Sequence, residues 1–264
     1  MPALEIRAVA DNLVEALRFF GQARPDAEIR DLAGVSLIFC GLNYAAFNAA
    51  LLTRPVGDDA RELARLIEVS AAHFDGRRLR WTCWVCDDFM GKGVRRQAHQ
   101  IFGRHGLRPL TCAPGMYAER LLPPQRPLPA IEIRRVSDAP TRATFGEIMA
   151  IAFDIPHSVS TSVYGAEQAW CGEFRGYVGY SNGQPVTTAG VAITGDVVGL
   201  YSVATLPQHR RLGFAEAIMR HVIGQARESA GIERTVLQST SSGLSLYEKM
   251  GYRKVTDFDV YIAG

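Results

Sequence analysis

The stretch HRRLGFAEA, residues 209–217, places two arginines and a glycine directly before a run of residues with helical periodicity. An ordinary helix start carries Ser, Asp or Asn at the capping position, and this one does not. The first turn of a helix presents unpaired N–H groups and a partial positive charge, so an anion can bind there. Gly213 would let a phosphate approach the backbone closely, and Arg210 and Arg211 add attraction and hydrogen-bond donors. The stretch therefore predicts a pyrophosphate site, with a solvated basic loop as the alternative.

The residues on either side predict a sheet with helices packed against it. Apolar residues recur at helical spacing from Ala215 to Ala226. Asn182-Gly183 and Gly195-Asp196 separate three alternating segments, as in tight hairpins. The expected elements are a strand at 131–136, a helix at 138–153, an antiparallel meander of three strands ending near Val203, a helix at 214–229, a strand at 234–240, a short helix at 242–250 closed by Gly251, and one or two final strands.

A proline-rich segment divides the chain. LLPPQRPLPA, residues 121–130, holds four prolines, which prevent a helix and weaken a central strand. We expect an N-terminal α/β domain over 1–122, a linker over 123–130 and a second domain over 131–264. The expected N-terminal elements are helices at about 10–22, 59–74 and 93–105 and strands at 34–42 and 78–85.

One internal echo suggests a repeat. IFGRHGLR, residues 101–108, aligns with LYEKMGYR, residues 246–253, with the aromatic residue, the glycine and the arginine in register. Junctions of a helix, a glycine and a strand also look alike by chance. The sequence leaves both explanations open.

Composition excludes several classes of protein. Twenty-nine Lys plus Arg against 27 Asp plus Glu give a net charge of +2, too small for a nucleic-acid-binding surface. No run of about 18 apolar residues is present, and charged residues interrupt the first twenty positions. We therefore expect a cytoplasmic protein that binds neither nucleic acid nor a membrane, with a homodimer left open.

The five cysteines predict reduced thiols and no metal site. Cys83 and Cys86 form a CxxC in RWTCWVCDD, but that run has the composition of a strand. Side chains three residues apart on a strand point to opposite faces, which does not suit two ligands of one metal ion.

The quoted stretch resembles the pyrophosphate loop of the GNAT superfamily of N-acetyltransferases, which reads Arg or Gln, two residues, Gly, one residue, then Gly or Ala. Arg210 to Ala215 match that pattern, and LYEKMGY, residues 246–252, resembles the family's short helix that bears a tyrosine. The resemblance covers about residues 131–264. It implies an α/β (α+β) fold with a mixed, largely antiparallel central sheet flanked by helices, to which the N-terminal half adds a second α/β domain that is open to being a degenerate copy.

The resemblance also implies roles for individual residues. Tyr247 would be the general acid, since a phenol is protonated at neutral pH and can protonate a leaving thiolate. Backbone groups of Tyr201 and Val203 would bind the pantetheine arm of coenzyme A. The expected pyrophosphate-binding residues are Arg210, Arg211, Leu212, Gly213, Phe214 and Ala215.

Two features depart from the family pattern. A cofactor-contacting Asn of many relatives is replaced in the stretch Gln238-Ser239-Thr240. In the N-terminal half, the stretch after the 34–42 strand lacks the loop motif, and Phe102 stands where Tyr247 would repeat. If the N-terminal half is a copy of the same fold, we therefore expect it to have lost its cofactor site.

These observations predict transfer of an acetyl group from acetyl-CoA to a small-molecule amine by direct attack, without a metal. A non-catalytic coenzyme A binding module is the main alternative, and a structural partner protein is a third. No general base is identified, although water chains ending at Asp196, Glu173 or a backbone carbonyl are options. Candidate acceptor-site residues, for which core or surface packing is the alternative, are Tyr44, Phe47, Asn48, His157 and Tyr164.

Overall fold

A continuous sheet runs through both halves of the chain. The computed structural model describes residues 2–263, and within them eleven strands lie in the order β1-β2-β3-β4-β11-β5-β10-β9-β8-β7-β6. The strands are β1 (Glu28–Leu32), β2 (Val35–Phe39), β3 (Ala49–Leu52), β4 (Trp81–Cys86), β5 (Leu107–Ala118), β6 (Glu132–Arg135), β7 (Arg175–Ser181), β8 (Gln184–Thr194), β9 (Val197–Thr205), β10 (Arg234–Gln238) and β11 (Arg253–Ala263). Among the described strand pairs, β3–β4 and β9–β10 are parallel and the others antiparallel. The predicted fold class is confirmed.

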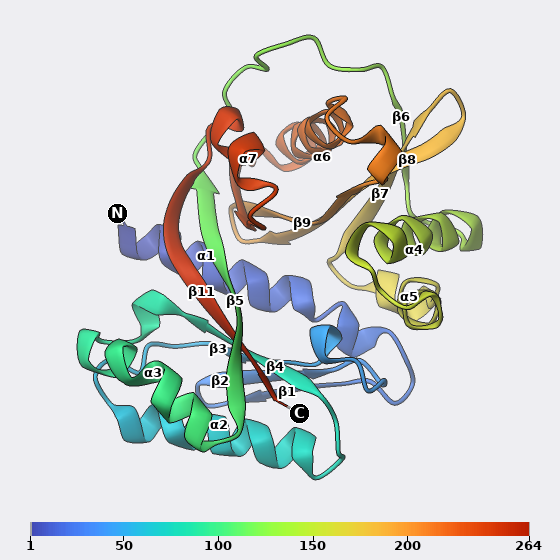
Figure 1. Cartoon of the computed structure of the whole chain (residues 1–264). Helices are drawn as coiled ribbons and strands as arrows, with labels where there is room; N and C mark the ends of the chain where they lie inside the picture. Colours follow the sequence, from blue (N-terminus) through green and yellow to red (C-terminus); the bar gives the residue numbers. More distant parts are fainter. Residues whose placement is uncertain (1, 264) are drawn as a thin grey trace.

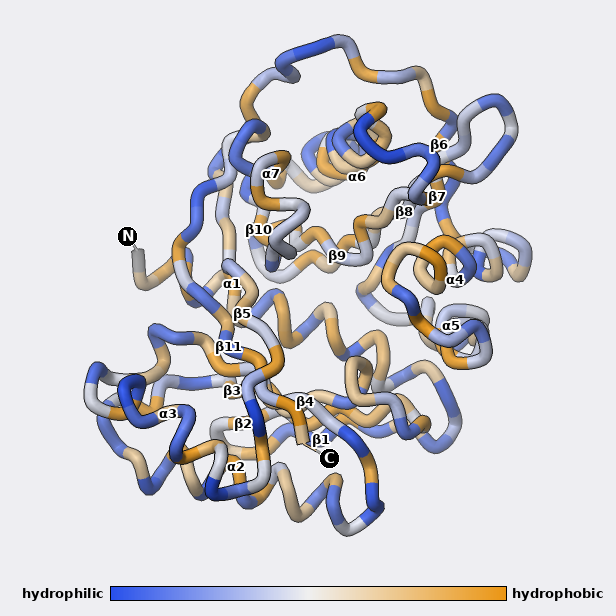
Figure 2. The backbone as a smooth tube through the Cα atoms, viewed as in Figure 1, coloured by the Kyte–Doolittle hydropathy of each residue, from blue (hydrophilic) through white to orange (hydrophobic). Residues whose placement is uncertain are grey.

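Helices flank this sheet. They are α1 (Pro2–Leu17), α2 (Ala60–Asp75), α3 (Lys92–Arg104), α4 (Ala139–Phe153), α5 (His157–Tyr164), α6 (Phe214–Ala230) and α7 (Leu244–Met250), with short 3₁₀ turns η1 (Phe20–Gln22), η2 (Ala45–Phe47), η3 (Asp87–Phe89), η4 (Glu167–Cys171) and η5 (Pro207–His209). Figure 1 shows α2 and α3 on the N-terminal half, α6 and α7 on the C-terminal half, and α1 between the halves. In Figure 2, α2 and α3 carry both hydrophilic and hydrophobic segments, as expected for helices with one face on a sheet. No helix within residues 2–263 is long and apolar enough to cross a membrane.

The two halves repeat one order of elements. In each half, three antiparallel strands are followed by a helix, a strand parallel to the third, a second helix and a long antiparallel strand. The order is β1-β2-β3-α2-β4-α3-β5 in the first half and β7-β8-β9-α6-β10-α7-β11 in the second. The echo between 101–108 and 246–253 lies at the matching helix-to-strand junctions. Gly106 and Gly251 both have positive φ there, 76° and 101°. This repetition favours a true structural repeat over chance.

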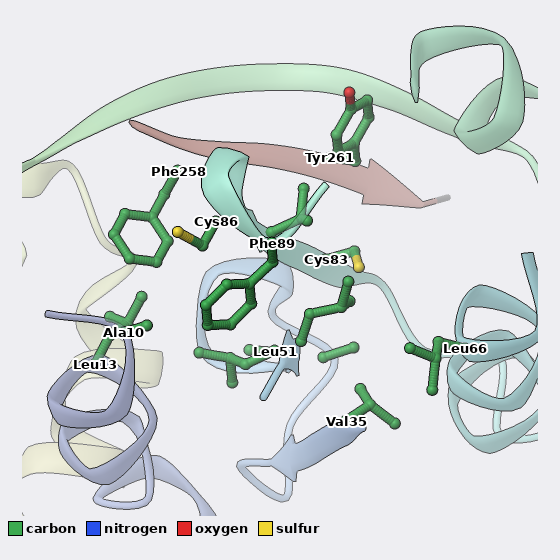
Figure 3. Close-up of a cluster of buried hydrophobic side chains, with 14 of the residues drawn as sticks. Ala10, Leu13, Val35, Leu51, Leu66, Cys83, Cys86, Phe89, Phe258 and Tyr261 are labelled. Atoms are coloured by element: carbon green, nitrogen blue, oxygen red, sulfur yellow. The ribbon is translucent and has the colours of Figure 1, made fainter. Parts of the chain in front are cut away.

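The last strand of each half crosses into the other half. β11 pairs with β4 and β5, and β5 pairs with β10 and β11. Figure 3 shows the result inside the N-terminal core, where Phe258 of β11 lies beside Cys86 and Tyr261 lies on the side of Cys83, its pairing partner on β4. Each half therefore depends on a strand that lies far away in the sequence.

The first helix also joins the halves. Asn12 of α1 is fully buried, accepts a hydrogen bond from Tyr201 Oη at 2.7 Å and donates one to the Ala192 carbonyl at 3.0 Å. A Cβ on Gly199 would lie 1.6 Å from Asn12 Oδ1, so only glycine allows this approach. The prediction of a helix near 10–22 was wrong in its bounds. The helix begins at Pro2 and ends at Leu17, and its buried residues pack into the cores of both halves.

Several other predicted elements also differ from the observed ones. The strand expected at 34–42 ends at Phe39, before Gly41 with its positive φ of 79°. The stretch after it, treated as one loop, contains η2 and β3. The final residues form one strand, β11. The strands β1 and β5 were not predicted. Short, exposed or proline-containing strands lack a clear alternating pattern, which explains most of these misses.

Cys83 and Cys86 lie on one strand, as the composition of their stretch predicted. Cys83 and Cys86 are buried on β4 and appear at separate places in Figure 3. Within residues 2–263, no group of three His, Cys, Asp or Glu side chains is arranged to hold a metal ion.

Replacing Asp87 of η3 by Asn is expected to stabilise the protein at neutral pH. Burial, and then the negative charge of Asp259, raises the pKa of the Asp87 carboxyl from 3.8 to about 6. Between these values the unfolded chain is ionised while the folded chain holds a proton, so stability falls as pH rises. Asp87→Asn removes this loss. It should raise the free energy of unfolding by about 1–2 kcal/mol at pH 8 and by almost nothing at pH 4.

Urea unfolding at the two pH values measures this difference. Asp88→Asn is the matched control, because Asp88 accepts a hydrogen bond from Thr256 at 2.7 Å that the change weakens. An equal gain at both pH values for Asp87→Asn would contradict the electrostatic explanation.

Candidate active site

The cavity of the C-terminal half lies where β9 and β10 separate. Their parallel pairing runs from Val197–Arg234 to Leu200–Leu237 and stops there. β9 continues to Thr205, whereas β10 ends at Gln238 and the chain turns toward α7. Two parallel strands that part in this way leave a gap between their ends.

This cavity has a volume of about 1170 Å³, large enough for an extended ligand. Its lining residues come from the linker, α4, β9, the loop before α6, and the segment leading into α7. They are Gln125, Arg126, Ala152, Phe153, Val203, Ala204, Thr205, His209, Arg210, Arg211, Gly213, Phe214, Ala215, Glu216, Thr240, Ser242, Gly243, Ser245, Leu246, Tyr247 and Lys249. Of the predicted site residues, Leu212 and Tyr201 are outside this lining.

The loop before α6 has the backbone of an anion site. Arg211 has φ of 64° and Gly213, the residue before the helix, has φ of 92°. No side chain caps α6, and the amides of Arg211, Leu212 and Gly213 donate to no backbone carbonyl within the described residues. Successive N–H groups next to residues of left-handed conformation form a concave anion-binding surface. The loop therefore has the unpaired donors that the sequence predicted.

Charge in the cavity is mostly positive. Arg210 donates from Nε to the Thr205 carbonyl at 3.2 Å, which keeps its guanidinium beside the loop. Glu216 is the one carboxylate among the described lining residues, and Arg220 engages it at 2.9 Å. The positive end of the helix thus faces no free acid in this cavity.

Tyr247 lines the same cavity as this loop. α7 carries it, and its ring packs against Gly243, where a Cβ would lie 2.7 Å from Tyr247 Cε2. Burial raises the pKa of the Tyr247 phenol to about 12. The hydroxyl is therefore protonated throughout the physiological range.

Comparisons with known proteins agree with this geometry. The family model described as an acetyltransferase (GNAT) domain matches residues 172–254. The match includes β9, the loop before α6, and α7, which line much of the cavity; the linker and α4 contribute the rest from outside the matched residues. Residues 172–254 form a GNAT acetyltransferase domain. Proteins of this family transfer acyl groups from acetyl-CoA.

Solved structures extend the likeness to both halves of the chain. A GCN5-related N-acetyltransferase from Kribbella flavida has a TM-score of 0.71 at 18% identity and covers 97% of this chain and 95% of its own. A GCN5-related N-acetyltransferase from Sphaerobacter thermophilus has a TM-score of 0.55 at 18% identity, covering 99% and 93%. A tandem GNAT protein from the clavulanic acid biosynthesis pathway has a TM-score of 0.57 at 12% identity, covering 96% and 94%. No curated protein matches the chain significantly. The fold is consistent with two GNAT-like halves.

The GNAT domain has a bulge on β9 at the centre of the site. Pairing with β8 shifts between Thr188 and Gly190, and Ser202 has φ of 49°. Thr188 Oγ1 holds the bulge by donating to the Ser202 carbonyl at 2.8 Å. The extra residue lies next to Val203, whose backbone the resemblance assigned to the pantetheine arm. The Tyr201 side chain, by contrast, bonds Asn12 and stays away from the cavity.

The matching place in the N-terminal half is closed. The loop after β3 is bonded to the loop after β4, with Val56 N donating to the Phe89 carbonyl at 2.8 Å and Gly91 N to the Gly57 carbonyl at 2.6 Å. The Asp59 carboxylate caps α2, accepting from its first turn at 3.0 and 3.1 Å. A carboxylate thus takes the donors that a phosphate would need, which supports the expected loss of a cofactor site in this half.

The other candidate residues are placed away from this cavity. Asn48 is fully buried and bonds Cys40 N and the Leu42 and Arg80 carbonyls. Phe47 and Tyr164 belong to an aromatic cluster between the halves, which also includes Phe19, Phe20 and Trp170. Packing therefore explains these residues.

Neither base option lines the cavity. Asp196 lies in the β8–β9 turn and pairs with Arg234, and Glu173 is exposed before β7. His157 is the exposed first residue of α5.

The contribution of the linker was missed by sequence reasoning. Gln125 and Arg126 line the cavity although they lie about 80 residues before the loop. The only feature of the sequence that could have pointed to this contribution was Arg126 itself, an arginine within a proline-rich segment.

Proposed function

We propose that this protein transfers an acetyl group from acetyl-CoA to the amine of a small molecule by direct attack, with Tyr247 as the general acid. One observation carries the proposal: a single cavity joins the uncapped N-terminus of α6 to a protonated phenol. The first feature suits a diphosphate and the second suits a leaving thiolate.

The fit to the coenzyme rests on the backbone. A Cβ on Gly213 would lie 3.1 Å from Pro129 Cδ, so the glycine allows the linker to pack against the helix start while the loop keeps its left-handed backbone. The amides from Arg210 to Ala215 would hold the pyrophosphate, and backbone groups of Tyr201 and Val203 the pantetheine arm. Acetyl-CoA supplies an activated acyl group with a thiolate leaving group.

The side chains of the site then have separate tasks. Tyr247 would donate its phenolic proton as negative charge grows on the departing sulfur. The backbone N–H of Val203, next to the bulge, would stabilise negative charge on the carbonyl oxygen. Ala152 and Phe153 of α4 offer an apolar surface to the acceptor within the same cavity.

A screen of small amines, scored by thiol release from acetyl-CoA, tests the proposal together with thermal shift by acetyl-CoA. Gly213→Val is expected to abolish the shift and lower binding about 100-fold or more, since a β-branched residue resists φ of 92° and its Cβ would crowd Pro129 at 3.1 Å, so the loop would have to change its backbone. Isothermal titration with acetyl-CoA measures the loss.

Gly224→Ala in the middle of α6 is the control. A Cβ there meets nothing within 4 Å, so binding should be unchanged and stability equal or slightly higher. Unaltered coenzyme binding by a folded Gly213→Val protein would contradict the assigned pyrophosphate site.

A further inference from the structure

The linker between the halves is attached at one end to the helix that carries Tyr247. Leu122 N donates to the Met250 carbonyl at 2.9 Å, at the C-terminal end of α7. A Cβ on Gly251 would lie 3.2 Å from Leu122 N, so the linker follows the end of α7 closely. Figure 1 shows the linker then passing over α7 and α6 before it reaches β6.

A second attachment lies at the start of α6. Pro129 packs on Gly213, and Arg126 Nη2 donates to the Arg211 carbonyl at 3.3 Å. The same Nη2 lies 3.6 Å from the position that a Cβ on Gly213 would occupy. Prolines at four positions of this short segment limit its freedom between the two attachments. The guanidinium is therefore held beside the amides that precede α6.

The charge of Arg126 has no compensating acid. Within residues 2–263, no carboxylate lies within ion-pair distance of Arg126, and its hydrogen bond goes to a neutral carbonyl. Nearby are the positive end of α6, two further arginines of the loop and Lys249, all lining one cavity. Arg220 already engages Glu216, the one carboxylate of the described lining, so the positive groups gathered here favour binding of an anion among them.

We propose that Arg126 of the linker binds the pyrophosphate of the coenzyme, so that the segment joining the halves forms one wall of the cofactor site. This inference rests on the proposed function. It adds a phosphate-binding residue from outside the GNAT domain. The phosphate oxygens would take the place of the Arg211 carbonyl as acceptors, and charge-assisted bonds of this kind are stronger than a bond to a neutral carbonyl.

Isothermal titration of the full chain with three probes tests the proposal: coenzyme A, 3′-dephospho-coenzyme A and pantetheine. Arg126→Gln should weaken the first two about tenfold and leave pantetheine, which lacks phosphate, unchanged. Arg126→Lys should recover part of the loss. Arg135→Gln is the matched control, because Arg135 is an exposed arginine of β6 outside the cavity.

Three results would overturn the assignment. Loss confined to coenzyme A would place Arg126 at the 3′-phosphate, and equal binding by Arg126→Gln and wild type would make it a bystander. Tighter binding by Arg126→Gln would mean that the linker obstructs the site. A wild-type protein that binds no coenzyme A would instead refute the proposed function, so the two failures are distinguishable.

Discussion

Tyr247→Phe is expected to lower turnover about 100-fold or more while the dissociation constant of acetyl-CoA changes less than about threefold. The change removes one oxygen and keeps the ring. That ring packs on Gly243 and meets the Tyr252 ring edge to face, with 5.9 Å between the ring centroids. Burial raises the pKa of Tyr247 to about 12, so the wild-type phenol stays protonated and should cause no fall in turnover up to about pH 10. Steady-state kinetics by thiol release and titration calorimetry measure the two quantities.

Tyr252→Phe is the matched control. Tyr252 is buried two residues beyond α7, outside the cavity lining, and its hydroxyl lacks a hydrogen-bond partner among the described residues. Its loss should therefore leave turnover unchanged. Full activity of Tyr247→Phe would remove the general acid from the proposal, and a wild type that binds acetyl-CoA without turnover on any amine would favour a non-catalytic binding module.

A chain that begins at Ala130 is expected to lose cooperative folding and with it all transfer activity. We propose that residues 1–122 and 131–264, joined by the linker at 123–130, fold as one unit. Without β5, the strands β10 and β11 lose the neighbour that lies between them. Met116 and Ala118 of β5 also leave the core around α6, and Asn12 no longer bonds Tyr201.

Thermal melting followed by circular dichroism, together with thiol release, checks this expectation. Co-expression of residues 1–129 with residues 130–264 is the control, since it restores every strand and cuts one peptide bond. A sharp melting transition and wild-type turnover in the short chain alone would show that the C-terminal half needs nothing from the rest.

Local patterns in the sequence determined much of this protein. The stripe from Ala215 to Ala226 placed α6 to within a residue of its observed end, and the Gly213 loop took the left-handed backbone that an anion site needs. Periodicity and turn residues report on neighbours in the chain, so helices, hairpins and helix ends could be predicted from them. The general-acid candidate followed from the family pattern around Tyr247.

β5 shows where local reasoning failed. Two prolines interrupt the strand pattern here, Pro109 and Pro114, and both lie in the part of β5 that is paired with β11 and not with β10. A proline is tolerated where a strand has a neighbour on one side only. Which side is free depends on the rest of the sheet.

The amino-acid sequence by itself thus determined most elements of the C-terminal half, the left-handed glycine before α6 and the lack of a phenolic hydroxyl at Phe102. Only the tertiary structure decided the exchange of β5 and β11, the burial of Asn12 between the halves, and the position of Arg126 beside the loop. These features join residues about 80 to 190 positions apart. Their pairing depends on surfaces that exist only after the chain has folded, and no short-range pattern encodes it.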